Sequence, residues 1–177
     1  MKDRWKESAG KVRIGVISDT HGRVPRDVLQ HFSTVDHIIH AGDVGRPEVL
    51  DELAAVAPLT AVSGNVDGSW TGVDLPEEAA GRVGSIRFLV AHRKEDLLQR
   101  HHDPAREGFD LVVSGHTHAA FADWLDGVLY LNPGSAGAGR AGGSTVAVVE
   151  VDLAGLDPHI VPLNGGDKAK GSEGSER

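Results

Sequence analysis

The chain of 177 residues contains no cysteine, which excludes a disulfide framework, a thiolate zinc site and a cysteine nucleophile. A metal would therefore be held by His, Asp, Glu or Asn, a donor set that suits manganese, zinc, iron or nickel better than copper(I) or iron–sulfur clusters. The length predicts one domain whose hydrophobic core needs neither disulfide nor metal to stabilise it.

Long apolar runs and positive charge are also scarce. No segment approaches the roughly 18 apolar residues that span a bilayer, and the N-terminal MKDRWKESAG lacks the apolar stretch of a secretory signal. We therefore expect a cytoplasmic protein with no membrane partner. The net charge of −8 disfavours a nucleic-acid polymer as partner. It leaves open an anionic substrate at a locally positive site.

Short β-branched runs alternate with helical segments between two polar tails. The composition predicts that the tails, 1–10 and 164–177, are flexible, which leaves a domain over 11–163. In its first half, we expect strands at 12–18, 37–43 and 59–65, separated by helices at 25–32 and 46–57. This spacing predicts a parallel sheet with right-handed crossovers.

The second half of the domain is expected to be mostly antiparallel β structure. Its predicted elements are a hairpin over 77–92, a helix at 94–101, a strand at 110–116, a hairpin over 120–132 that turns at Asp126-Gly127, and strands at 144–153 and 158–164. The two halves together predict two packed sheets flanked by helices.

Side chains that can bind metal follow five consecutive predicted strands. They are Asp19 and His21, then Asp43, then Asn65, then His92, and finally His116 and His118 in the stretch SGHTH. Ligands of open α/β sheets bind beyond the carboxyl ends of the strands, so these side chains are expected to converge. Each alone would be an ordinary turn former, helix cap or structural histidine. Five successive strand ends of this kind indicate a metal centre.

Seven donors are too many for one tetrahedral ion. They suit two ions about 3.5–4 Å apart that share a bridging carboxylate, as in two-metal hydrolases. Two dications bound by two aspartates leave a net positive charge at the site. Within roughly 8–10 Å this local charge outweighs the net negative charge of the chain. An anionic substrate is therefore expected.

The blocks DTHG, AGD, SGNVD, AH and SGHTH, in this order and at these spacings, resemble the calcineurin-like metallophosphoesterase superfamily. The similarity is greatest to its small single-domain bacterial and archaeal phosphodiesterases, which also share LNPGS at 131–135. The resemblance covers 12–163. It implies an α/β fold, a four-layer α/β/β/α sandwich of two mixed sheets flanked by helices.

The resemblance also implies two divalent ions and a role for each ligand. One ion would take Asp19, His21, Asp43 and His118, and the other Asp43, Asn65, His92 and His116. Asp43 would bridge them, and Asp43, Asn65 and His92 would be catalytic as well as metal-binding. Manganese is expected first, with nickel, zinc, iron or magnesium as alternatives. A hydroxide shared by the ions would attack the phosphorus of a small phosphate ester.

Two positions depart from the family pattern. Val66 follows Asn65 where many members carry a histidine thought to protonate the leaving group, a contribution of about 10²–10⁴-fold. The small relatives also lack it, so we expect esters with good leaving groups, or another acid such as water or Asp67. Arg93 follows His92 where glycine is usual, and is either solvated or a cation near the substrate.

Four weaker features complete the candidate list. Arg23 is a phosphate contact or a surface residue, and His40 is a partner of the ligands or a core histidine. The glycine-rich stretch 132–143 lacks the ending of a P-loop and is expected to be a loop near the metal edge. His101-His102 is expected to complement a helix dipole rather than bind metal.

The expected function is therefore a two-metal phosphodiesterase. A phosphomonoesterase and a non-catalytic binding scaffold on the same fold are the alternatives. A scaffold has no chemical need for all seven ligands, so their presence favours an enzyme. An oligomer is compatible with the sequence.

Overall fold

The structure is a computed structural model that describes residues 11–69, 71–137, 143–152 and 154–164. The predicted tails, apart from Asn164, lie outside these residues. In chain order the elements are β1 (Val12–Ile17), α1 (Arg26–His31), β2 (His37–His40), α2 (Pro47–Ala54), β3 (Leu59–Ala61), β4 (Glu78–Val83), β5 (Ile86–Ala91), α3 (Lys94–Arg100), β6 (Leu111–Val113), β7 (Phe121–Leu125), β8 (Val128–Asn132), β9 (Thr145–Asp152) and β10 (Gly155–Pro162).

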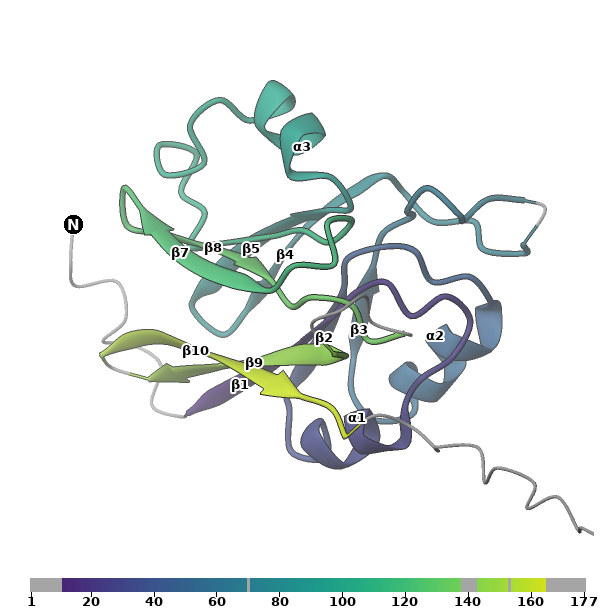
Figure 1. Cartoon of the computed structure of the whole chain (residues 1–177). Helices are drawn as coiled ribbons and strands as arrows, with labels where there is room; N and C mark the ends of the chain where they lie inside the picture. Colours follow the sequence, from purple (N-terminus) through teal and green to yellow (C-terminus); the bar gives the residue numbers. More distant parts are fainter. Residues whose placement is uncertain (1–10, 70, 138–142, 153, 165–177) are drawn as a thin grey trace, which may run out of the picture.

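The strands form two five-stranded mixed sheets that stack face to face (Figure 1). The first has the order β10-β9-β1-β2-β3, and its three strands from the first half of the domain are parallel, as predicted. β3 ends at Ala61, earlier than expected. The chain leaves the sheet there and forms the loop that carries Asn65.

The second sheet has the order β4-β5-β6-β8-β7 and corrects one expectation. Its centre is parallel, because β5 pairs with β6 and β6 with β8 in parallel, whereas only β4 and β7 at the edges are antiparallel. The β7–β8 hairpin itself was predicted correctly. Asp126 and Gly127 both have positive φ, 50° and 81°, as a type I′ turn requires. The hairpin folds back so that β8, not β7, pairs with β6.

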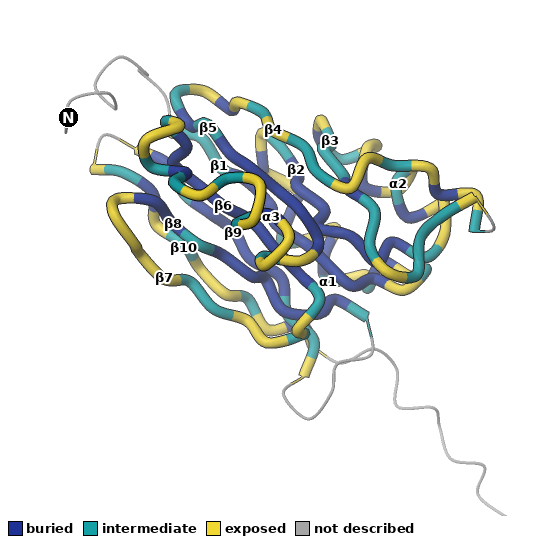
Figure 2. The backbone as a smooth tube through the Cα atoms, turned by 90° about the horizontal axis from the view of Figure 1, so that it is seen from above, coloured by how far each residue is buried: buried dark blue, intermediate teal, exposed yellow. Residues whose placement is uncertain are grey.

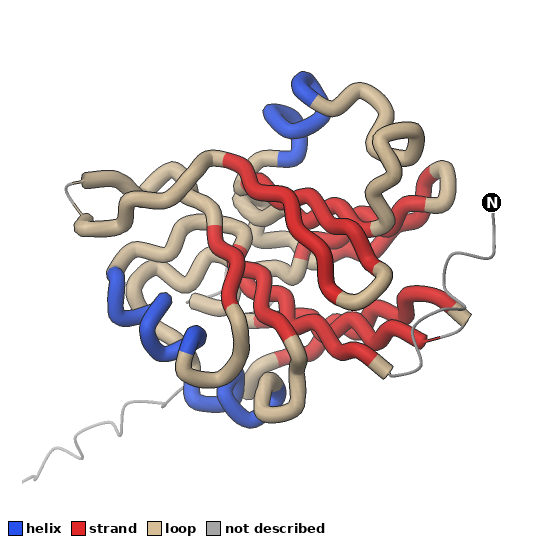
Figure 3. The backbone as a smooth tube through the Cα atoms, turned by 180° about the vertical axis from the view of Figure 1, so that it is seen from behind, coloured by secondary structure: helices blue, strands red, loops and turns tan. Residues whose placement is uncertain are grey.

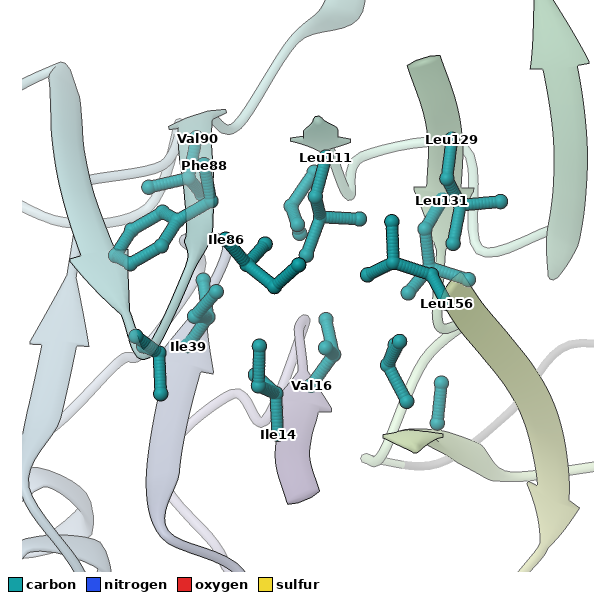
Figure 4. Packing of buried hydrophobic residues seen from close by; sticks show 14 of the residues in the cluster. Ile14, Val16, Ile39, Ile86, Phe88, Val90, Leu111, Leu129, Leu131 and Leu156 are labelled. Atoms are coloured by element: carbon teal, nitrogen blue, oxygen red, sulfur yellow. The ribbon is translucent and has the colours of Figure 1, made fainter. Parts of the chain in front are cut away.

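Alternation of apolar side chains along each strand divides the core into three layers. Ile14, Val16 and Ile39 of the first sheet face Phe88 and Leu111 of the second (Figure 4). A second cluster packs α1 and α2 under the first sheet, and a third packs Leu97 of α3 against the second sheet.

The helices therefore cover the outer faces of the two sheets, which Figure 3 shows from behind. Figure 2 shows that the residues of the central strands are mostly buried, whereas those of β7 at the edge are largely exposed. This confirms the predicted sandwich of two mixed sheets with helices outside. No helix in the described parts of the chain is long and apolar enough to span a membrane.

Candidate metal centre

The residues that follow the strands have an unusual backbone conformation. Asp19, His21, Asp43, His116 and His118 all have positive φ, between 49° and 69°. Among the described non-glycine residues, only Asp126 in the hairpin turn shares this feature. The left-handed region is sparsely populated by such residues, and strain of this kind concentrates at functional sites. The strain thus falls on five of the seven predicted ligands.

The side chains of these residues converge from both sheets. Potential ligand atoms of Asp19, His21 and His118 lie within 4.8 Å of one another, and so do those of Asp19, Asp43 and His92. Asp19 is common to the two groups. Asp43 follows the first sheet and His92 the second, so the site lies where the two sheets meet.

The two remaining predicted ligands lie beside these groups. The His116 ring centroid is 5.2 Å from that of His92, and the His116 backbone N–H donates to Asp19 Oδ2 at 3.2 Å. Asn65 is exposed on the loop after β3 and lines the same surface hollow as His92. The structure thus places all seven predicted ligands around one site.

Three buried ligand atoms show that this site suits a cation. Within the described residues, Asp19 Oδ1, His92 Nε2 and His118 Nδ1 have no hydrogen-bond partner. Asp19 Oδ1 lies 3.1 Å from His118 Nε2, but without hydrogen-bond alignment. An unpaired buried polar atom costs about 1–3 kcal/mol, a penalty that a bound divalent ion would remove. Nitrogen and oxygen donors without sulfur also suit the ions expected from the sequence.

His92 is oriented for binding through one ring nitrogen. Its Nδ1 lies 2.7 Å from the carbonyl oxygen of Ala41, so Nδ1 carries the proton and donates it. Nε2 is then left facing Asp43 Oδ1 at 3.5 Å. A ligand histidine is commonly held in this way by a backbone carbonyl, which fixes the tautomer and the ring orientation.

Asp43 and His92 shift each other's pKa. Burial alone would raise the pKa of the Asp43 carboxyl, but contact with His92 and the N–H of Val66, which donates at 3.0 Å, lower it to about 2. Burial alone would lower the pKa of His92, yet Asp43 and the Ala41 carbonyl raise it. Asp43 is therefore ionised at neutral pH, as a metal ligand must be.

His40 and Asp67 both contact the loops that carry the ligands. His40 is fully buried and lies 2.9 Å from Thr20 Oγ1, while its Nδ1 accepts the Gly42 N–H at 3.2 Å. Burial lowers the pKa of His40 to about 4, which keeps the ring neutral. It therefore joins the loop after β1 to the loop after β2.

Asp67 joins the loop after β2 to the loop after β3. Its carboxylate accepts the backbone N–H groups of Val44, Gly45 and Gly64 at 2.8–3.0 Å. A Cβ on Gly64 would overlap Asp43 Oδ1 and the Asp43 backbone, so this approach requires glycine. Asp67 thus fixes the loop that carries Asn65 against the residues that follow Asp43.

Asn132 makes a third contact of this kind, which no sequence motif predicted. Asn132 is fully buried, and its amide donates to the Gly115 carbonyl at 2.8 Å and to Thr117 Oγ1 at 3.1 Å. Its Oδ1 accepts the N–H of Gly134 at 2.9 Å. The first two bonds hold the turn that carries His116 and His118, and the third fixes the Asn132 side chain against its own loop. The LNPGS block had indicated family membership without a role for this residue.

Ser18 and Ser135 were also missed. Ser18 Oγ donates to Asp19 Oδ2 at 2.6 Å, and Ser135 Oγ donates to the Asp19 carbonyl at 3.1 Å. The Ser18 hydroxyl therefore orients the Asp19 carboxylate, and the Ser135 hydroxyl holds the Asp19 backbone. Small polar residues next to a strand end carry no strong sequence signal, which is why they were overlooked.

The weaker candidates have different surroundings. Arg23 is exposed. Arg93 is about half exposed, with Nε 3.7 Å from Asp96 Oδ2, and it lines the hollow beside His92. His101 ends α3, where its ring nitrogens contact Glu107 at 2.5 Å and Glu78 at 2.8 Å. Hydrogen bonding to Glu107 outweighs burial and, with Glu78, raises its pKa. His101 therefore bridges carboxylates and lies apart from the ligand groups.

Comparisons with known proteins identify the family of the chain. Residues 12–153 match the model of the calcineurin-like phosphoesterase superfamily domain. A probable metallophosphoesterase of Methanothermobacter thermautotrophicus is 35% identical over 157 residues, which cover 84% of this chain and 91% of the relative. A phosphodiesterase of Methanocaldococcus jannaschii is 28% identical over 160 residues, 80% of this chain and 94% of that protein.

The fold has a solved counterpart as well. Vacuolar protein sorting 29 of Cryptosporidium parvum superposes with a TM-score of 0.72 at 20% identity, over 89% of this chain and 94% of its own. That identity supports the fold alone. The family model, in contrast, spans most of the domain, including all seven residues that the structure brings together. The chain therefore belongs to the calcineurin-like phosphoesterase superfamily, as a member of its metallophosphoesterases.

Proposed function

We propose that this protein is a phosphodiesterase that depends on two divalent metal ions and hydrolyses small phosphate esters. The observation that carries the proposal is the convergence of ligand atoms of Asp19, His21, Asp43, His92 and His118 from both sheets, three of these atoms buried without a hydrogen-bond partner. As the family resemblance implies, Asp19, His21, Asp43 and His118 would hold one ion, and Asp43, Asn65, His92 and His116 the other. Ions bound there would lower the pKa of water and polarise phosphoryl oxygens.

The residues of the chain contribute mainly by positioning. His92, fixed by the Ala41 carbonyl, keeps Nε2 toward Asp43, and the low pKa of Asp43 keeps its charge available. Hydrogen bonds of Asp67, His40 and Asn132 fix the loops that carry the metal-binding residues, before any ion or substrate binds. Such preorganisation reduces the reorganisation needed to bind charge.

The leaving group is expected to depart without a histidine acid. Val66 occupies the position after Asn65, and both Asp67 oxygens accept backbone N–H groups. The pattern supports esters whose leaving group needs little protonation, or protonation by water. We propose manganese as the first ion to test, with nickel, zinc, iron and magnesium after it.

The test combines metal analysis with hydrolysis of diester and monoester substrates. The purified protein, freed of metal by chelation and reloaded with each ion, is assayed with bis(4-nitrophenyl) phosphate and 4-nitrophenyl phosphate. We expect two ions per chain and faster hydrolysis of the diester. A protein that binds two ions but cleaves neither ester would instead support the scaffold alternative, and faster hydrolysis of the monoester would support a phosphomonoesterase.

A further inference from the structure

A hollow of about 290 Å³ opens beside the proposed metal centre. Its inner wall includes Asn65 and His92, and its outer wall includes Arg93, Asp96 and Arg100 at the two ends of α3. The volume lies just below the roughly 300–1,000 Å³ of typical ligand pockets, so it suits a small group rather than a polymer. A group esterified to a phosphate at the metal centre would extend into this space.

The walls of the hollow offer hydrogen-bond donors and acceptors side by side. Arg93 lies 3.7 Å from Asp96, and Arg100 lies 2.9 Å from Glu78 and 3.6 Å from Glu77. A hydroxyl group both donates and accepts, so a pair of hydroxyls can bind a carboxylate and a guanidinium together. The Arg93–Asp96 pair is about half exposed and Glu77 is 85% exposed, and such pairs are held weakly enough to rearrange around a ligand, whereas the partly buried Glu78 holds Arg100 in place.

The same lining disfavours two other kinds of group. Among the described residues, the lining of the hollow contains no Phe, Tyr or Trp, so the only planar groups on which a nucleobase or phenyl ring could stack are the His92 ring, which faces Asp43, and arginines already paired with carboxylates. Each arginine already faces a carboxylate, so a second anionic group would meet Glu77 or Asp96 at close range. Like charges placed together in this way act against a ligand.

We propose that the hollow binds the second ester group of a phosphodiester and selects a small, neutral, hydroxylated group over an aromatic or anionic one. This inference rests on the proposed function and names the substrate class that the same site takes. Arg100 and Asp96 are then specificity-determining residues, because they contact the retained part of the substrate rather than the reacting atoms.

The test uses diesters that share one leaving group. The metal-loaded protein is assayed with 4-nitrophenyl phosphodiesters whose second group is methyl, 2,3-dihydroxypropyl, phenyl or carboxymethyl. The nitrophenolate is constant, and because the vicinal hydroxyl of the dihydroxypropyl ester can itself displace it to give a cyclic phosphate, only formation of the acyclic phosphate monoester counts in the ratio of kcat/KM to that of the methyl ester. We expect the dihydroxypropyl ester to exceed the methyl ester about tenfold, the effect of one net hydrogen bond, and the other two to show no gain.

Three variants make the test specific. Arg100→Met should reduce the dihydroxypropyl preference to near one, whereas Arg106→Met, at a residue with an 89% exposed side chain outside the hollow, should leave it unchanged. Asp96→Asn should raise the carboxymethyl ester relative to the methyl ester, and it keeps the test available if Arg100→Met does not fold. Equal ratios for all four esters, or the highest ratio for phenyl or carboxymethyl, would overturn the inference.

Failure of the proposed function would be recognised separately. It would appear as no cleavage of the methyl ester by protein carrying two ions. In that case the dissociation constants of the esters, measured by calorimetry, replace kcat/KM. Tighter binding of the dihydroxypropyl ester than of the methyl ester would support the hollow as a binding site, and equal binding would overturn it.

Discussion

Asp43 Oδ1 lies 3.5 Å from His92 Nε2, and the two residues follow strands of different sheets. The contact lowers the pKa of Asp43 and raises that of His92. Burial disfavours an ionised carboxylate at the meeting point of two stacked sheets, and the neutral His92 ring, whose Nε2 has no hydrogen-bond partner, does not balance its charge. A bound cation would balance it, which supports the proposal that Asp43 is a metal ligand.

Asp43→Asn should abolish turnover, because it removes the charge proposed to be shared by both ions. We expect kcat to fall at least about 100-fold and the affinity for metal to fall with it, since even partners outside the ligand set are typically worth 10–100-fold. Steady-state kinetics and calorimetric titration with Mn²⁺ measure the two effects. Asp123→Asn, the same change at an exposed residue of β7, is the matched control. Normal activity of Asp43→Asn would refute the bridging role.

Asn132→Asp should weaken metal binding without unfolding the protein. The aspartate keeps the size of the side chain but loses the two N–H donations to Gly115 and Thr117 that hold the His116–His118 turn. We expect a loss of metal affinity of about 10–100-fold, measured by calorimetry on the metal-free protein. If the affinity matches that of wild type while thermal stability falls, Asn132 only stabilises the fold.

Gly64→Ala should impair the centre through a steric effect. The added Cβ would overlap Asp43 Oδ1, so either the loop or the carboxylate must move. We expect weaker metal binding and lower activity. Gly127→Ala is the control, because a Cβ there meets no atom within 4 Å and only the positive φ opposes it, at about 1 kcal/mol. Equal metal affinity of the two variants would argue against the close packing at Gly64.

The metal-free protein should lose stability in mild acid through His40. Its folded pKa of about 4 lies below the 6.5 of an unperturbed histidine, so the unfolded chain binds the proton first as the pH falls. This contribution is present above pH 6.5 and is lost as the pH falls toward 4, by about 2 kcal/mol between pH 7 and 5. Urea denaturation at both pH values measures it.

The control for this pH effect is His40→Gln, which has no titrating ring but keeps a donor and an acceptor. The loss of unfolding free energy between pH 7 and 5 should be about 2 kcal/mol smaller in the variant. An equal loss in both proteins would show that other groups cause the acid sensitivity.

Much of the fold could be predicted from local sequence, because short β-branched runs bounded by turn signals set the strands and Asp126-Gly127 set one hairpin. The insertion of β8 between β6 and β7 could not be predicted in the same way. Parallel pairing of β6 with β8 depends on contacts between distant segments, whereas a hairpin signal describes only the adjacent strand.

The candidate ligands could be found because each lies within a few residues after a strand, and the ends of these strands lie near one another. The residues that orient them were harder to find. Asn132 acts through hydrogen bonds to the backbone of Gly115, seventeen residues away in sequence, and any buried amide has the same appearance in a sequence. Gly64 owes its role to a close approach that only the folded structure reveals.

The most direct test of the central proposal is the rate of bis(4-nitrophenyl) phosphate hydrolysis as Mn²⁺ is added stepwise to the metal-free protein. A two-metal site predicts little activity up to one equivalent and a rise that is complete at two equivalents per chain. Full activity at one equivalent, or no hydrolysis with two ions bound, would contradict it.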